Sequence, residues 1–189
     1  NLLLFAVVAP FFTTYLIRTI SWVTILSDES PVTELLTTLG LTSNGRILAT
    51  APAVIAGLVY NFLPFMVLPI YASLERLDTR LMEAAKDLYA NAATTFFKVT
   101  LPLSAPGVVA GTLLTFIPAT GDYVNAQFLG GSNNQMIGNV IQSLYLKQSD
   151  YPAAAALSFV LMAIILVIVL IYIRFAGSEA LMGEEGAAI

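Results

Sequence analysis

Long apolar runs that are almost free of charge constrain this chain more than any other feature. Four runs share this property: residues 2–26, 47–71, 106–128 and 153–173. Each exceeds the roughly 20 residues that a helix needs to cross the hydrocarbon core of a bilayer. The runs are apolar all round rather than alternating, which favours helices over barrel strands. The sequence therefore predicts an all-α membrane protein, a bundle of transmembrane helices.

Composition narrows the possible functions. Charged residues make up 11% of the 189 residues, whereas soluble domains carry about a quarter, so we expect neither a soluble nor a nucleic-acid-binding protein. The sequence has no cysteine, so it has no thiol nucleophile, and no histidine, which is the usual general base. These two residues are also the usual ligands of zinc. It also lacks a Gly-x-x-x-x-Gly-Lys-Ser/Thr phosphate loop. We therefore expect no catalytic residue, metal or cofactor, and any ATP hydrolysis must occur on a separate polypeptide.

The distribution of basic residues predicts the orientation in the membrane. Residues 72–104 together with Arg174 supply five Lys and Arg, whereas residues 27–46 and 129–152 supply two. Cytoplasmic loops are enriched in these residues. We therefore expect loop 72–104 and the C-terminus to be cytoplasmic, and the other two loops to face outward.

The loop of residues 75–102 has a helical pattern of its own. Its apolar residues recur at helical spacing: Leu77, Leu81, Ala84, Ala85 and Leu88. A second short amphipathic run follows, and Leu101-Pro102 is predicted to end it before the next span. Short helices are marginal in water unless an apolar face packs on something, so this loop is expected to need a partner surface.

Loop 75–102 resembles the EAA loop of ATP-binding-cassette importer permeases. Glu83-Ala84-Ala85 and Val99-Thr100-Leu101-Pro102 carry the resemblance, with Tyr89 where the family usually has glycine. A tyrosine makes a turn with positive φ costlier. In that family the loop docks on the cytoplasmic ATPase and couples its motion to the spans. The resemblance implies these coupling residues: Glu83, Ala84, Ala85, Asp87, Leu88, Tyr89, Leu101 and Pro102. The alternative is an amphipathic hairpin lying on lipid.

The resemblance covers almost the whole chain. Residues 14–19, 61–75, 116–131 and 136–139 are similar to permeases of the spermidine and putrescine type. It aligns the four runs with the last four of six spans in the type I permease fold, so we expect an N-terminally truncated sequence. It implies a partial transmembrane domain over residues 1–189 that imports a small cationic solute, namely a polyamine, by alternating access.

The partners implied by the resemblance are two copies of the ATPase, a second permease subunit, an extracytoplasmic substrate-binding protein and the lipid bilayer. An ATPase-independent carrier or channel subunit is the alternative function. Such a protein would need paired carboxylates or a filter within the membrane, and the predicted spans contain only two charged residues, Arg18 and Asp122.

Charged residues inside predicted spans are candidates for function because burying them in lipid is costly. Asp122 could attract an ammonium group, with the ring of Tyr123 and the amides of Asn125 and Gln127 beside it. Arg18 would repel a cationic cargo. Snorkelling, or an ion pair between Arg18 and Asp122, is the structural alternative for both charges.

Overall fold

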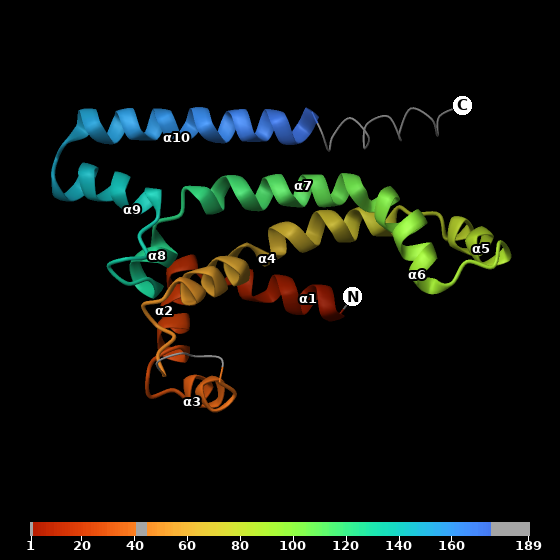
Figure 1. Cartoon of the computed structure of the whole chain (residues 1–189), viewed down its shortest axis with the longest axis horizontal. Helices are drawn as coiled ribbons and strands as arrows, with labels where there is room; N and C mark the ends of the chain where they lie inside the picture. Colours follow the sequence, from red (N-terminus) through yellow and green to blue (C-terminus); the bar gives the residue numbers. More distant parts are fainter. Residues whose placement is uncertain (1, 41–44, 175–189) are drawn as a thin grey trace. The chain divides into compact units, whose positions relative to one another are not determined.

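The computed structural model describes residues 2–40 and 45–174, and these residues form helices and no strand (Figure 1). This confirms the predicted all-α class. The α-helices are α1 (Leu2–Val8), α2 (Tyr15–Ile25), α3 (Pro31–Thr38), α4 (Ala51–Glu75), α5 (Thr79–Asp87), α6 (Ala92–Thr95), α7 (Leu101–Thr120), α8 (Val124–Leu129), α9 (Ile137–Gln142) and α10 (Tyr151–Tyr172). One 3₁₀ turn, η1 (Ala9–Phe12), and two π turns, η2 (Phe96–Thr100) and η3 (Ser143–Lys147), extend them.

The helices group into two compact units. Unit 1 comprises residues 1–64 and 117–161, and unit 2 comprises residues 65–116 and 162–189. Unit 1 therefore holds α1–α3, α8 and α9, and unit 2 holds α5 and α6. The long helices α4, α7 and α10 each contribute residues to both units.

The first apolar run is not one straight helix. The sequence predicted a continuous span over residues 2–26, but the segment Leu2–Phe12 is bent by 101° from Tyr15–Ile25. Thr13 and Thr14 between them have extended backbone, with ψ of 141° and 138°. Pro10 also lacks the N–H that a continuing helix would use. A count of apolar residues detects the run but not the break within it.

The third run is longer and starts earlier than the sequence predicted. We expected Leu101-Pro102 to end a loop helix and a span to cover residues 106–128, but one helix runs over Ala92–Thr120. The π turn explains the continuity. The Leu101 N–H donates to the Phe96 carbonyl, so Pro102, which has no N–H, falls where the hydrogen-bond register changes. The helix ends at Thr120, and α8 forms separately.

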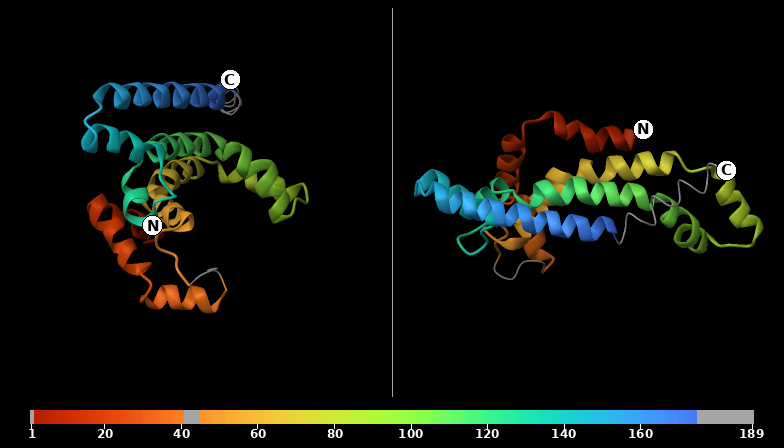
Figure 2. Two further views of the ribbon diagram at one scale, coloured as in Figure 1. Left: turned by 60° about the vertical axis from the view of Figure 1, so that its left-hand side comes forward. Right: turned by 90° about the horizontal axis from the view of Figure 1, so that it is seen from above.

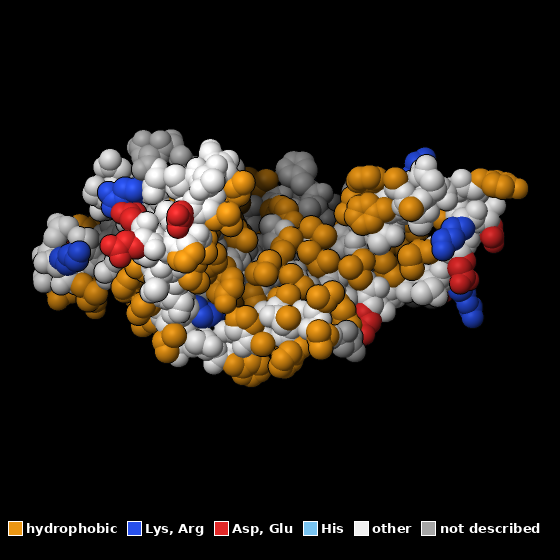
Figure 3. All heavy atoms as spheres, turned by 90° about the horizontal axis from the view of Figure 1, so that it is seen from below, with side chains coloured by type: hydrophobic (Ala, Val, Ile, Leu, Met, Phe, Trp, Pro, Cys, Tyr) orange, Lys and Arg blue, Asp and Glu red, His pale blue; other side chains and the backbone are white. Residues whose placement is uncertain are grey.

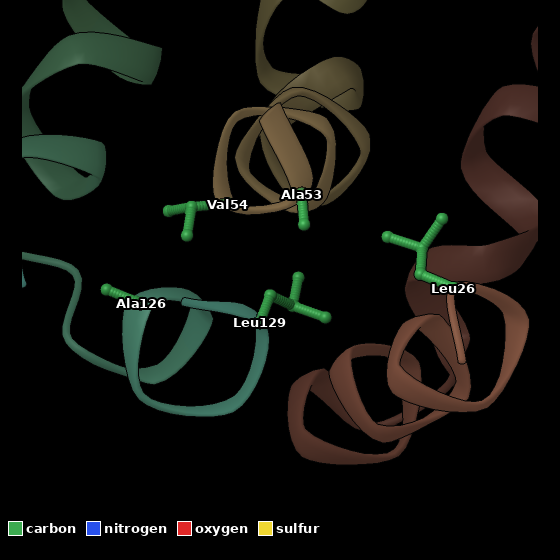
Figure 4. Packing of buried hydrophobic residues seen from close by; sticks show 5 residues of the cluster. All are labelled: Leu26, Ala53, Val54, Ala126 and Leu129. Carbon is green, nitrogen blue, oxygen red and sulfur yellow. The ribbon is translucent and has the colours of Figure 1, made fainter. Parts of the chain in front are cut away.

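Unit 1 has a small apolar core between α2, α4 and α8 (Figure 4). Its buried members are Leu26, Ala53, Val54, Ala126 and Leu129. Gly57 of α4 lets α8 approach closely, because a Cβ atom at this position would lie 2.7 Å from the Asn125 Oδ1 atom. The core therefore holds α8 against the first half of α4.

In unit 2, glycines bring α7 against α4. A Cβ atom on Gly107 would lie 2.5 Å from the Ser73 Cβ and 2.6 Å from the Pro69 carbonyl oxygen. One on Gly111, a turn later, would lie 2.9 Å from the Met66 sulfur. The two helices run side by side in Figure 1 and Figure 2. Small residues at this spacing allow the close backbone approach typical of helix pairs in membranes.

Large hydrophobic side chains are widely exposed. Figure 3 shows them over much of one face, with few charged side chains among them. On α10, Phe159, Met162 and Leu166 are all more than half exposed. Within residues 2–40 and 45–174, three helices, α4, α6 to α7 and α10, are long and apolar enough to cross a membrane, and the bent pair could supply a fourth. Lipid is the solvent that suits such a surface.

Candidate functional site

Loop 75–102 contains the short helix α5 and the start of the helix Ala92–Thr120, and each of these helices is capped by its own sequence. Asp78 begins α5, where its Oδ1 accepts the Arg80 N–H at 2.9 Å. Asn91 begins α6, where its Oδ1 accepts the Thr94 N–H at 2.8 Å. Such caps satisfy N–H groups that have no partner within the helix and stabilise its first turn. Local sequence therefore defines where both helices start.

The turn between these helices is a Schellman motif with a tyrosine in the left-handed position. The Tyr89 N–H donates to the Lys86 carbonyl at 2.9 Å, and the Ala90 N–H to the Ala85 carbonyl at 3.0 Å. Tyr89 has φ of +57°. The turn expected from the resemblance is thus present, and tyrosine makes it at a conformational cost that glycine would avoid.

The apex of the loop presents large side chains to the outside. Leu88 and Tyr89 are 82% and 98% exposed, whereas Ala85 is buried against the rest of the loop. The remaining residues of the predicted coupling set are exposed: Glu83, Ala84, Asp87, Leu101 and Pro102. The last two lie in the continuous helix rather than at a helix end. All of the predicted set except Ala85 is therefore accessible to a partner.

A second group of chemically distinctive residues lies inside unit 1. The Tyr15 hydroxyl donates to Asp122 and accepts from the Asn125 side-chain amide at 2.6 Å. Asp122 Oδ1 accepts the N–H groups of Val124 at 2.6 Å and Asn125 at 3.1 Å, and Oδ2 accepts the Asn125 amide at 2.6 Å. The carboxylate thereby caps α8 and fixes it to α2.

The network continues into α4. The Asn61 side-chain amide donates to Asn125 Oδ1 at 3.1 Å and to Thr19 Oγ1 at 3.3 Å. We call Tyr15, Thr19, Asn61, Asp122 and Asn125 the polar cluster. All except Tyr15 are buried, so the cluster ties three helices together at positions where water cannot compete.

The four predicted cargo-pathway residues do not form one site. Asp122 and Asn125 belong to the polar cluster, but Tyr123 lines a cavity of about 590 Å³ together with Tyr145 and Tyr151. Gln127 is exposed and lines a different cavity of about 250 Å³. Tyr123 and Gln127 are thus exposed, whereas Asp122 and Asn125 are buried.

The ion pair that the sequence allowed between Arg18 and Asp122 is not formed. The Tyr15 hydroxyl bonds the carboxylate instead, and no carboxylate of the described residues lies within ion-pair distance of Arg18. An ion pair elsewhere joins Arg46 Nε to Asp28 at 3.1 Å, on exposed side chains. Sequence reasoning also missed Asn61, although an amide within an uncharged apolar run was a usable signal.

Comparison with known proteins assigns the chain to a family. Residues 2–179 match the family described as the binding-protein-dependent transport system inner membrane component. The chain belongs to this family. Membership agrees with the all-α architecture and the apolar helices, and it identifies the chain as a multi-pass membrane component of a transport system rather than an enzyme.

Curated members of this permease family resemble the chain along most of its length. It is 44% identical to the spermidine/putrescine transport system permease protein PotB of Haemophilus influenzae, over 92% of the chain and 61% of that protein. It is 43% identical to the protein of the same name from Escherichia coli K12, over 92% of the chain and 63% of that protein. The inner membrane ABC transporter permease protein YdcU of Escherichia coli K12 is 36% identical over 86% of the chain and 55% of its own length. The chain thus spans about three fifths of the length of these relatives.

Proposed function

We propose that the chain acts as the permease subunit of an ATP-driven importer and that loop 75–102 is its docking element for the ATPase. The observation that carries this proposal is mechanical. The loop is closed by local caps and a Schellman turn, presents Leu88 and Tyr89 outward, and runs without interruption into the helix Ala92–Thr120. A push on the apex would therefore be transmitted along a continuous helix towards the span.

The proposed assembly contains two ATPase copies, a second permease subunit and an extracytoplasmic substrate-binding protein. Loop 75–102 would face the cytoplasm, with residues 129–152 outside, in keeping with the bias of basic residues. The predicted cytoplasmic C-terminus lies outside the described residues. ATP binding and hydrolysis on the partner would bias the spans between inward-open and outward-open states.

The proposed cargo is a polyamine of the spermidine and putrescine type, because the names of the relatives state this cargo. We assign the four pathway residues two roles. Asp122 and Asn125 hold α8 in place through the polar cluster. Tyr123 and Gln127, which are exposed, would contact the passing cargo through an aromatic face and an amide.

Copurification tests the docking role. The full-length permease is expressed with its ATPase, carrying either Glu83→Ala combined with deletion of residues 84–90, or Glu29→Ala as a control on an exposed residue of a different loop. We expect the loop variant to lose at least about tenfold of the bound ATPase and the control to retain it, which corresponds to about 1.4 kcal/mol or more of binding energy.

Two results would contradict the proposal. Normal ATPase binding by the loop variant would exclude the docking role. Polyamine uptake that continues without nucleotide in proteoliposomes would favour the ATPase-independent carrier or channel.

A further inference from the structure

Arg18 is a buried cation that the polar cluster does not use. Its side chain is 7% exposed, and its Nε–H has no hydrogen-bond acceptor in the described part of the chain. The guanidinium carbon lies 4.9 Å from the ring centroid of Phe11 and 5.7 Å from that of Tyr15. Aromatic faces attract a cation but accept its N–H groups only weakly. The buried Nε–H is therefore left without a conventional acceptor among the described residues.

A cavity adjoins this side chain. It has a volume of about 240 Å³ and lies at the bend between the two halves of the first run, where its lining includes Thr13, Arg18, Trp22 and Tyr60. Hydroxyl and indole groups on the wall can donate further hydrogen bonds. None of the described residues that line it is acidic. A cavity of this chemistry suits an anion and would repel the cationic cargo proposed above.

We propose that this cavity binds a phosphate group and that a phospholipid headgroup supplies it. The planar guanidinium presents paired N–H groups that match two phosphate oxygens. The N-terminus of α2, one turn before Arg18, has no side-chain cap and adds positive potential.

The surroundings favour a lipid as the source of the phosphate. Ile25 of α2 lines the cavity and is partly exposed, as is Phe11 beside the guanidinium, and these side chains offer an apolar surface for acyl chains. Trp22 and Tyr60 pack edge to face, with centroids 5.5 Å apart, and such aromatics concentrate at the level of lipid headgroups. The inference concerns a site apart from the ATPase and the cargo, and it does not depend on the proposed function.

Native mass spectrometry of the full-length permease with added phosphatidylglycerol tests the site. Arg18→Gln removes the charge, whereas Arg18→Lys keeps the charge but loses the paired N–H groups of the guanidinium. Arg46→Gln is a matched control because Arg46 is exposed and paired with Asp28. We expect phosphatidylglycerol binding to fall at least about tenfold in Arg18→Gln and less in Arg18→Lys, with no change in the control. Diacylglycerol, which has no phosphate, should show no dependence on Arg18.

Other outcomes overturn the proposal. Wild-type phosphatidylglycerol binding by Arg18→Gln excludes the site. Thermal stabilisation by inorganic phosphate that depends on Arg18, without lipid binding, makes free phosphate the ligand. If Arg18→Gln no longer binds the second permease subunit but binds phosphatidylglycerol normally, a carboxylate of that subunit rather than a lipid occupies the cavity. If the Arg18 variants do not fold, Thr13→Val keeps the cation and should weaken phosphatidylglycerol binding severalfold; unchanged binding then excludes the site.

Discussion

Tyr89 carries a conformational cost that no contact in the described part of the chain offsets. A left-handed backbone costs a non-glycine residue roughly 1–2 kcal/mol. Its ring is almost wholly exposed, so packing inside the described chain does not compensate. A side chain kept under such conditions has its use outside the fold, which agrees with a docking role for the apex of loop 75–102.

Replacing Tyr89 by glycine should stabilise the fold. We expect Tyr89→Gly to raise the free energy of unfolding by up to about 1 kcal/mol, since relief of the left-handed strain exceeds the added flexibility of the unfolded chain. Leu88→Gly is the matched control, because Leu88 has φ of −84° and should lose stability. Thermal unfolding of the full-length protein in detergent measures both. A loss of stability in Tyr89→Gly equal to that of the control would contradict the strain argument.

The polar cluster predicts a large cost for removing its carboxylate. Asp122→Ala would leave the Tyr15 hydroxyl, the Asn125 amide and two backbone N–H groups without their acceptor. We expect a loss of about 3 kcal/mol, against about 1 kcal/mol for Tyr15→Phe, and non-additivity of about 1 kcal/mol in the double variant. Denaturation in detergent checks this, with Glu29→Ala as an exposed control. Additive effects would show that the two residues act independently.

At the scale of elements, the positions where helices continue or break depend on backbone hydrogen bonds and dihedral angles rather than on hydropathy. Pro102 does not end a helix because a π turn places its missing N–H at a change of register. Two extended threonines bend the first run by 101° although its apolar side chains continue. The first effect joins loop 75–102 to a span, and the second creates the cavity beside Arg18.

The pairing of α4 with α7 in unit 2 predicts sensitivity at Gly107. Gly107→Val must displace Ser73 and the Pro69 carbonyl, and we expect a loss of about 2 kcal/mol. Ala110→Val, on an exposed position of the same helix, adds the same kind of side chain and should change stability by less than about 0.5 kcal/mol. Unfolding in detergent compares the two variants. A loss in Gly107→Val no larger than that in Ala110→Val would contradict the close packing of α7 on α4, because valine favours a helix more than glycine does.

At the scale of the whole molecule, the exposed apolar surface and the bias of basic residues together predict a topology. The 189 residues contain no cysteine, so single cysteines can report on which side a loop lies. With Tyr89→Cys and Ser132→Cys, both at exposed positions, a membrane-impermeant maleimide should label only Ser132→Cys on intact cells. Both should react after permeabilisation. Labelling of Tyr89→Cys on intact cells would reverse the proposed orientation.

The amino-acid sequence by itself determined the features that depend on local chemistry. Uncharged apolar runs gave the all-α membrane class, since lipid leaves a chain few other ways to satisfy its backbone. The spacing around Glu83 located α5 and the start of the next helix, though not its continuation to Thr120. The position of Tyr89 located the turn between them, because caps and left-handed turns involve residues close in the chain.

Only the tertiary structure decided which distant residues meet. Tyr15 and Asp122 are 107 positions apart, and their contact requires α2 and α8 to pack around the same stretch of α4. The same packing leaves Arg18 without a carboxylate and beside a cavity. Hydropathy and spacing describe one segment at a time, whereas the partners of a buried polar group depend on how segments pack together in space.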